Sequence, residues 1–129
     1  MTQTEKGSPL WKLKAPEATL TPKGAARLSS PEIEFHKAGR LSSTARAREA
    51  YVRGGSRDVL LDGDVVIVSA EEKSTLRTPR LAYRADKALF HTEADVVIER
   101  PGAVVRGRGL EADSSLSKIR IFKQETSLR

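Results

Sequence analysis

Four segments of the chain share one order of apolar and small residues: apolar, any, small, any, any, apolar, any, apolar. The copies span Leu13–Leu20, Ala45–Val52, Leu76–Tyr83 and Val105–Ala112. In each copy the apolar and small positions advance by two, then three, then two residues. A step of two is the alternation of a β-strand, and the step of three is the extra residue of a β-bulge, which bends the strand. The pattern predicts a repeat protein made of long strands folded over at their middle.

Shorter alternating apolar pairs lie between these copies. They are Ile33/Phe35, Val65/Ile67, Val96/Ile98 and Ile119/Ile121. Clusters of Gly, Pro, Ser and Asp separate the segments, as in Thr21–Gly24 and Arg100–Gly102, and these residue types favour tight reversals. We therefore predict about eight antiparallel strands joined by short hairpin turns, with no helix.

One segment has a different local preference. Residues Thr44–Val52 are rich in Ala, Arg and Glu, which are good helix formers, and Thr44 is a suitable N-cap. Its register with the other three copies favours a bent strand instead.

The inward positions of the repeat have little bulk. The small position holds Ala15, Ala47, Thr78 and Gly107 in turn, and aromatic residues make up 5% of the chain. Because β interiors are normally filled to high density, two sheets with this lining either approach closely or leave room for a guest. The residues alone leave both a thin packed sandwich and an apolar trough open.

At 129 residues the chain has the length of one domain. It contains no Cys, so disulfide bonds and Cys-ligated zinc play no part. No apolar run approaches the roughly 20 residues that span a bilayer. We expect one domain over residues 9–123, a disordered leader at residues 1–8 and a C-terminal tail at residues 124–129.

The chain lacks the residue patterns of an enzyme. Its histidines, His36 and His91, have no His, Cys or carboxylate at metal-ligand spacing, and the serine pairs lie beside turns. We expect no catalytic residue, no metal and no cofactor. The net charge of +6 favours polyanions, but Tyr51 and Phe122 are too few outward aromatic residues for a nucleic-acid stacking platform. We expect no nucleic-acid partner.

A meander that does not close leaves two edge strands with unpaired backbone groups. We expect these at residues 9–14 and 117–123, with Trp11, Leu13 and Ala15 on the first edge and Ile119, Ile121 and Phe122 on the last. Their lysines and arginines guard against aggregation, or the edges accept a strand from a partner sheet. Edge pairing of this kind also allows a homodimer.

Four stretches together resemble the periplasmic domain of the LptC family of lipopolysaccharide transport proteins. They are Leu13–Ala18, Leu60–Val65, Leu76–Tyr83 and Gly107–Asp113, and the similarity runs from about Leu10 to Phe122. The soluble bridge protein LptA and the amino-terminal domain of the outer-membrane assembly protein share the same jellyroll repeat.

This resemblance implies an antiparallel, twisted, V-shaped β-jellyroll, or β-taco, of two sheets that hold lipopolysaccharide acyl chains between them. The cations Arg77, Arg80, Arg84, Arg106 and Arg108 would attend phosphates at the mouth of the trough. The residues expected to contact lipid are Leu13, Ala47, Val65, Ile67, Leu76, Thr78, Leu81, Tyr83, Val96, Ile98, Val105 and Leu110.

The resemblance also implies partners and a location. The amino-terminal edge would meet the jellyroll of the inner-membrane Lpt ABC transporter, and the carboxy-terminal edge an LptA-like bridge protein. The location would be the periplasm, with a natural membrane anchor on a helix that this chain does not contain. The alternatives are a solid β-repeat scaffold that binds only proteins, and an LptA-like soluble bridge assembled by edge-strand pairing.

Overall fold

The computed structural model describes the backbone of residues 2–5, 8–55 and 58–128 and the side chains of residues 11–55 and 58–123. Within these residues every strand pairing is antiparallel, which confirms the prediction of an all-β fold. The strands are β1 (Thr2–Glu5), β2 (Ser8–Lys14), β3 (Glu17–Leu20), β4 (Ala26–Ser29), β5 (Glu32–Lys37), β6 (Arg40–Arg46), β7 (Glu49–Val52), β8 (Val59–Ser69), β9 (Thr75–Arg84), β10 (Leu89–Arg100), β11 (Ala103–Asp113) and β12 (Ile119–Leu128).

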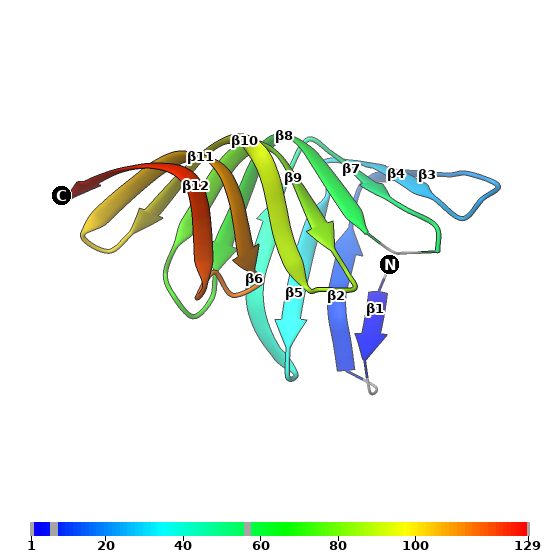
Figure 1. Ribbon diagram of the computed structural model, residues 1–129. Coiled ribbons are helices and arrows are strands. Elements are labelled where there is room, and N and C mark those ends of the chain that lie inside the picture. The colour runs from blue at the N-terminus through cyan, green and yellow to red at the C-terminus, as the bar shows by residue number, and fades with distance from the viewer. Residues whose placement is uncertain (1, 6–7, 56–57, 129) are drawn as a thin grey trace.

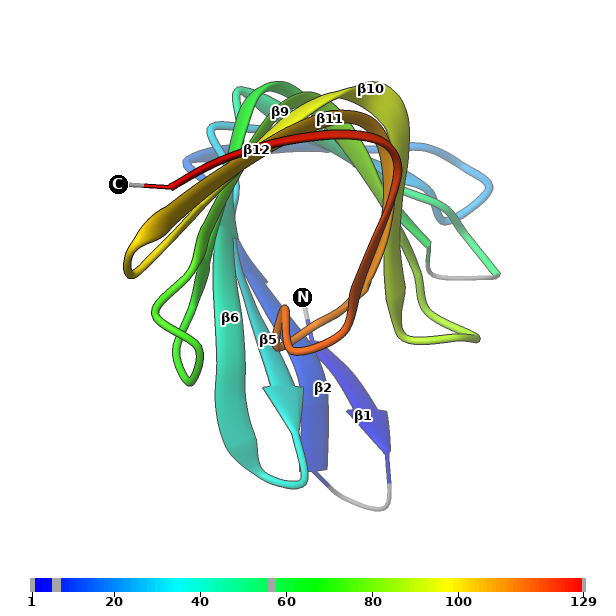
Figure 2. The same ribbon diagram turned by 60° about the vertical axis from the view of Figure 1, so that its left-hand side comes forward.

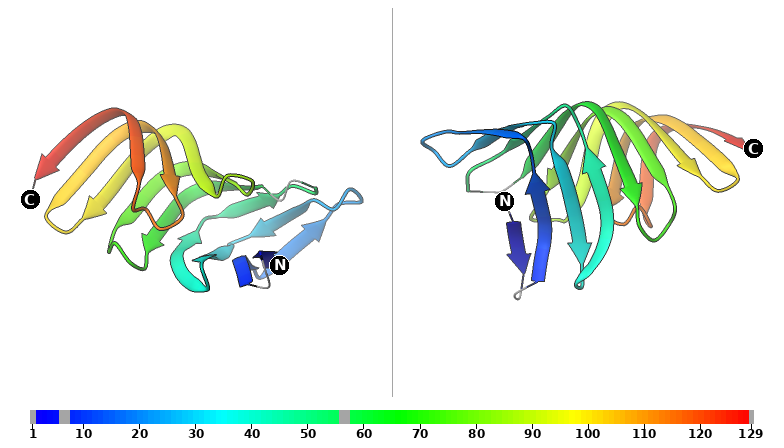
Figure 3. Two further views of the ribbon diagram at one scale, coloured as in Figure 1. Left: turned by 60° about the horizontal axis from the view of Figure 1, so that its bottom comes forward. Right: turned by 180° about the vertical axis from the view of Figure 1, so that it is seen from behind.

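The strands lie side by side from β1 at one end of the molecule to β12 at the other, so the two termini are far apart (Figure 1 and Figure 3). Viewed along this array, the strands arch over a crest and descend on both sides as two walls (Figure 2). The predicted V-shaped arrangement of two sheets is therefore present.

The two walls separate along β8. Its second half, Val66–Ser69, pairs with β6, whereas its first half, Val59–Asp62, pairs with β7. We define wall A as β1, β2, β5 and β6 with the adjoining halves of the later strands, Val65–Ser69, Thr75–Thr78, Asp95–Arg100, Ala103–Arg108 and Lys123–Leu128. Wall B consists of β3, β4 and β7 with the other halves, Val59–Asp62, Arg80–Arg84, Leu89–Thr92, Leu110–Asp113 and Ile119–Ile121.

The chain crosses the crest at local irregularities, as the repeat pattern predicts. In β9 the exposed pair Pro79 and Arg80 lies between buried Thr78 and Leu81, which is the step of three in the sequence. The return strand β8 bends as well: Gly63 and Asp64 have positive φ values of 88° and 48°, and the register shifts there. Every long strand therefore contributes one half to each wall.

The crest also requires a close approach of two backbones at β11 and β12. A Cβ atom on Gly107 would collide with the main-chain oxygen of Lys123 and with the side chain of Ile121. This contact explains why the fourth copy of the repeat has Gly at its small position, since glycine is used where backbones approach closely.

Three expectations differ from the structure. Residues 2–5 of the expected leader form β1 on the free side of β2, and residues 124–128 of the expected tail continue β12 along wall A. In both places a neighbouring strand offers backbone groups for pairing. Ala18 and Leu20 are exposed, Leu20 by 70%, because β3 is the outermost strand of wall B and no described element covers it. The helix-forming segment 44–52 forms β6 and β7, as its register predicts.

Candidate functional site

The inward side chains of the two walls meet in one apolar interior. It runs from Trp11 on β2 through Ile67 and Leu81 to Leu110 on β11, and these side chains belong to a single buried cluster. Alternation along each strand places one residue in two on this inner face. The interior is therefore a property of the repeat and continues through most of the array.

An aromatic contact joins the walls within this interior. Phe35 of wall A lies 4.6 Å from Tyr83 and 4.9 Å from Phe90 of wall B, measured between ring centroids, and Tyr83 and Phe90 are 5.5 Å apart. Tilted and edge-to-face rings of this kind add about 0.5–1.5 kcal/mol per pair to the burial of their area. Here the protein fills the space between its own walls.

The interior opens near the carboxy-terminal end of the array. A pocket of about 230 Å³ is lined by Ile98 and Val105 of wall A and by Ile119 and Ile121 of wall B, with Arg100 and Ser117 as its polar residues. A pocket that combines four aliphatic side chains with the polar groups of Arg100 and Ser117 suits an amphiphile that carries an anionic group.

A short loop crosses the open side of the V beside this pocket. This closing loop, residues 114–118 between β11 and β12, reaches from wall B towards wall A (orange, lower centre of Figure 2). The Oγ of Ser69 donates a hydrogen bond of 2.6 Å to the carbonyl of Ser115, and Nη2 of Arg100 donates one of 3.0 Å to the carbonyl of Leu116. The Leu116 side chain is fully buried in the core cluster.

Asp113 gives the closing loop its shape. Its Oδ1 accepts hydrogen bonds from the main-chain N–H groups of Ser117 and Lys118, at 2.9 and 3.1 Å. Its Oδ2 accepts from the hydroxyls of Ser117 and Ser115, at 2.6 and 3.1 Å. Partial burial raises the pKa of this carboxyl, but the hydrogen bonds together outweigh burial and hold the pKa below its ordinary value of 3.8.

A family model described as lipopolysaccharide-assembly, LptC-related matches residues 1–127. The chain belongs to the LptC family. Among solved structures, this LptC-family chain is similar to LptH from Pseudomonas aeruginosa, described as the LptA homologous periplasmic component of the conserved lipopolysaccharide transport device. The TM-score is 0.70 at 11% identity, over 92% of this chain and 94% of LptH, which shows a shared fold. No curated protein sequence matches the chain.

These comparisons confirm the predicted LptC family and the LptA-like jellyroll fold. They also support involvement in lipopolysaccharide transport, because LptC-related and LptA-like proteins are transport components. None of the described residues forms a helix that could cross a membrane. No group of three potential metal ligands occurs among them either.

Most of the residues expected to contact lipid in this LptC-family chain lie inside the packed interior. Except for Thr78, each belongs to the core cluster or packs against it. Ile67, Leu76, Leu81 and Leu110 are 0% exposed. Val105 is half-buried and lines the open pocket. A bound acyl chain would therefore occupy space that protein side chains fill in this structure.

Thr78 has a different place from that expected of a lipid contact. Its Oγ1 lies 2.8 Å from the main-chain oxygen of Asp95 and 3.2 Å from that of Arg80, at the crest where β9 bends. The hydroxyl thus bonds backbone atoms near the bulge of this LptC-family fold. The sequence pattern identified Thr78 as a small inward residue without showing this role.

Of the two strands expected at the edges of the sheet, β12 lies at an edge of the described sheet and β2 does not. Trp11 and Leu13 are buried, and β1 pairs with residues 8–12, so β2 is not the outermost strand of wall A. Ala15 follows the end of β2 at the crest and is half-buried. At the other end β12 is the outermost strand.

The side chains of β12 point to both sides of the sheet. Ile119 and Ile121 line the pocket, whereas Phe122 is 50% exposed and lies beneath the guanidinium of Arg120, at 5.5 Å. This arrangement leaves β12 with an apolar inner face and a partly apolar outer face at the edge of the sheet.

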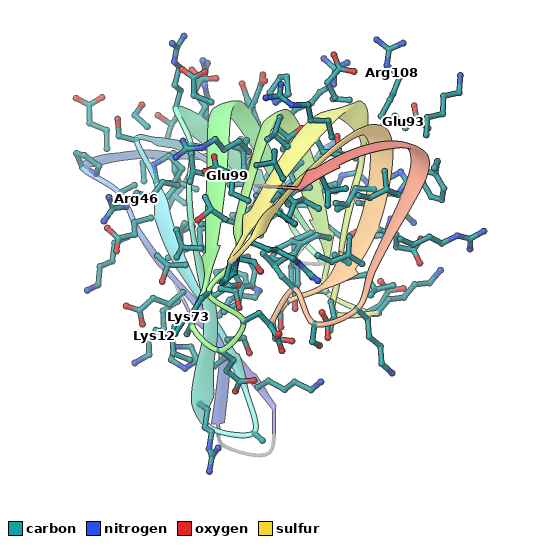
Figure 4. All side chains as sticks on the ribbon, turned by 90° about the vertical axis from the view of Figure 1, so that its left-hand side faces the viewer. Lys12, Arg46, Lys73, Glu93, Glu99 and Arg108 are labelled. Carbon is teal, nitrogen blue, oxygen red and sulfur yellow. The ribbon has the colours of Figure 1, made fainter. Side chains whose placement is uncertain are left out.

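The cations expected at the mouth lie elsewhere. Arg77 and Arg108 point outward and pair with Glu99 and Asp95, at 3.3 and 3.0 Å; Figure 4 shows Arg108 projecting from the crest. Arg77, together with Asp95, the partner of Arg108, borders an outer groove of about 590 Å³ over β8–β10 that also contains Val66 and Val97. This groove is on the opposite side of the sheet from the interior, and its exposed ion pairs contribute little stability.

Sequence reasoning missed the residues that border the mouth, namely Arg100, Ser69 and Leu116. Arg100 and Ser69 end strands and appear as ordinary turn-flanking residues. Leu116 carries a usable signal, because a lone apolar residue between Ser114–Ser115 and Ser117 is unusual in a polar turn. Such a residue suggests a loop that folds back onto the core.

Replacing Asp113 by Asn should lower the melting temperature of the protein, and the decrease should be larger at pH 7 than at acidic pH. The folded-state pKa of Asp113 is lowered, so its contribution to stability is full above the unfolded pKa, near 3.8, and is lost as the pH falls through the lower folded pKa. The difference in melting temperature between wild type and Asp113→Asn should therefore narrow from pH 7 to pH 3. Asp86→Asn, in the exposed β9–β10 turn, is the matched control. A difference in melting temperature that stays constant over this pH range would contradict stabilisation of the closing loop by the ionised Asp113 carboxylate.

Proposed function

We propose that this chain receives acyl chains of lipopolysaccharide between its two walls and relays the lipid from an inner-membrane ABC transporter to a periplasmic bridge protein. The supporting observation is the apolar interior that follows the repeat from β2 to β11 and opens beside β12. Membership of the LptC family supports lipopolysaccharide as the substrate. The role needs no catalytic group, and we propose that the protein is not an enzyme.

The energy of such binding comes from apolar burial. Each methylene moved from water into an apolar site contributes about 0.8 kcal/mol, so five methylenes of one chain contribute about 4 kcal/mol. These contacts have no fixed direction, and the lipid can advance along the interior without breaking a strong bond. Similar apolar residues recur along the array, as in Ile67, Leu76 and Ile98, which offers similar environments at successive positions.

Binding between the walls requires the interior to change. Most of its side chains, such as Ile67 and Leu81, are fully buried, so acyl chains must displace some of them or separate the walls. The walls are joined at the crest by continuous strands, whereas the open side is held by side-chain contacts and the closing loop. We infer that the V opens at this side, with the crest as its hinge.

The edges supply the partner surfaces of this proposal. β12, with Ile119, Ile121 and Phe122, accepts a strand of an LptA-like bridge protein. At the other end Trp11, Leu13 and Ala15 belong to the region that meets the transporter jellyroll, and the exposed strand β3 extends this surface on wall B. A homodimer formed by edge pairing uses the same strands. The proposed location is the periplasm, next to an inner-membrane anchor.

A solid β-repeat scaffold is the second candidate, because the Phe35–Tyr83–Phe90 contact fills the interior between the walls. A scaffold would give no lipid crosslink from inside the V. An LptA-like soluble bridge that assembles through its edges would bind lipid and would also crosslink to a second copy of itself.

A photo-crosslinking residue inside the V should capture lipopolysaccharide. We expect p-benzoylphenylalanine in place of Ile67 or Leu81 to form a crosslink with purified lipopolysaccharide, detected as a shifted band on a gel. The same residue in place of Val68, the outward neighbour of Ile67 at 48% exposure, is the matched control. Capture only from position 68, with the substituted proteins still folded by circular dichroism, would contradict binding between the walls.

The same photo-crosslinking residue, placed on the outer surface of the sheet, should identify the strand that binds the bridge protein. A crosslinking residue in place of Arg120 on the edge strand β12 should capture an LptA-like bridge protein. In place of Arg27 on β4, which is exposed but paired on both sides by β3 and β7, it should not. Equal capture from both positions would argue against strand addition at β12.

A further inference from the structure

The closing loop covers a defined layer of the interior. Ser69 and Arg100 lie two residues beyond Ile67 and Ile98 on the inward face of wall A. Leu76 lies in register with both of these isoleucines. The two hydrogen bonds from wall A to the loop therefore close the open side directly next to the Ile67–Leu76–Ile98 layer.

The loop is held in a conformation that its own residues disfavour. Leu116 has a φ of 59°, in the left-handed region that a branched, bulky residue rarely adopts. Such a conformation persists only where the surrounding contacts hold it, and it is often found at segments that move. Here those contacts are the buried Leu116 side chain and the hydrogen bonds from Ser69 and Arg100. Releasing them also releases the strain.

The open pocket lies beside the loop and shares residues with its attachment. Arg100 and Ser117 line the pocket, and its volume of about 230 Å³ is below the roughly 300–1,000 Å³ of sites that enclose a whole drug-sized ligand. It therefore has room for one alkyl chain. Arg100 donates to a neutral carbonyl in this structure, and a phosphate would accept a stronger, charge-assisted hydrogen bond from the same guanidinium.

We propose that the closing loop is a displaceable latch on the interior, and that an anionic amphiphile opens it from the pocket beside it. An alkyl chain of the lipid occupies the space between Ile98, Val105 and Ile121, Leu116 leaves the interior, and Arg100 exchanges the Leu116 carbonyl for the phosphate of the headgroup. This inference rests on the proposed function and adds the point where the interior opens at its bridge-protein end and the group recognised there.

Opening of the latch can be measured without lipopolysaccharide. The chain has no cysteine, so Leu76→Cys introduces one thiol into the layer behind the loop, at a position that is 0% exposed. Its labelling rate by a maleimide reports how often the interior opens. Ser69→Ala with Arg100→Met removes both hydrogen bonds, and we expect labelling roughly tenfold faster or more. The matched control is Ser43→Ala with Arg46→Met, a serine of wall A whose hydroxyl has no hydrogen-bond partner among the described residues and an arginine that pairs with Glu32.

Two further measurements separate the parts of the proposal. Monodecyl phosphate, which can bind Arg100 and open the latch, should accelerate the labelling of Leu76→Cys more than decyl maltoside, which has the same chain, and Arg100→Met should abolish this difference. Leu116→Ser, which removes the buried side chain and leaves both hydrogen bonds, should accelerate labelling as well. Melting temperatures under each condition exclude global unfolding as the cause.

The outcomes distinguish this inference from the proposed function. Labelling rates equal to the control in both latch variants would overturn the latch, and equal acceleration by the two amphiphiles would overturn the role of Arg100. Faster labelling together with absence of any lipopolysaccharide crosslink at position 67 would support the latch as an opening device but contradict lipopolysaccharide as its ligand.

Discussion

Burial of apolar side chains between two walls that are built from the same strands is the interaction on which this structure depends. The long strands β8–β12 cross the crest, most of them at irregularities in pairing, and place inward residues on both sides, so neither wall forms without the other. Gly63 and Asp64 in β8 and the close approach at Gly107 make the crossing possible. The interior is consequently as long as the repeat array itself, and it is lined by residues that repeat rather than by a single site.

Because the side chains of the two walls pack against each other, binding a lipid between the walls costs free energy. Phe35, Phe90 and Leu116 are fully buried in the interior, and protein interiors of this kind are close-packed. Lipid therefore competes with the protein's own side chains. In the proposed mechanism such a site is a minor conformation that a ligand makes dominant, and the net affinity is lower than that of an equally apolar open cavity. Moderate affinity would suit the proposed relay of lipid.

Much of the fold followed from the sequence, because the period of two with one step of three is a direct consequence of strand geometry. Segment 44–52 shows this well, since register overrode its helix propensity. The pattern could not show that β8 and β10 bend as well, because their apolar pairs occupy only one wall. Nor could it show that β1 covers β2 or that Leu20 is exposed, since these depend on where the array ends.

The site was less accessible to sequence reasoning than the fold. The inward residues were identified correctly as a face, but whether that face is open depends on how Phe35, Tyr83 and Phe90 meet across the walls, which no local pattern records. The cation at the mouth is Arg100 rather than Arg77 or Arg108, because strand-end position and ion pairing with Glu99 and Asp95 decide which arginine reaches the interior.

The central claim, that the walls separate to admit acyl chains, is tested most directly by the distance between their tips. Spin labels on Glu71→Cys in the β8–β9 turn of wall A and Lys87→Cys in the β9–β10 turn of wall B report this distance by pulsed electron paramagnetic resonance. Our account predicts a longer distance when lipopolysaccharide is added. Saturable binding of lipopolysaccharide with an unchanged distance distribution would contradict it.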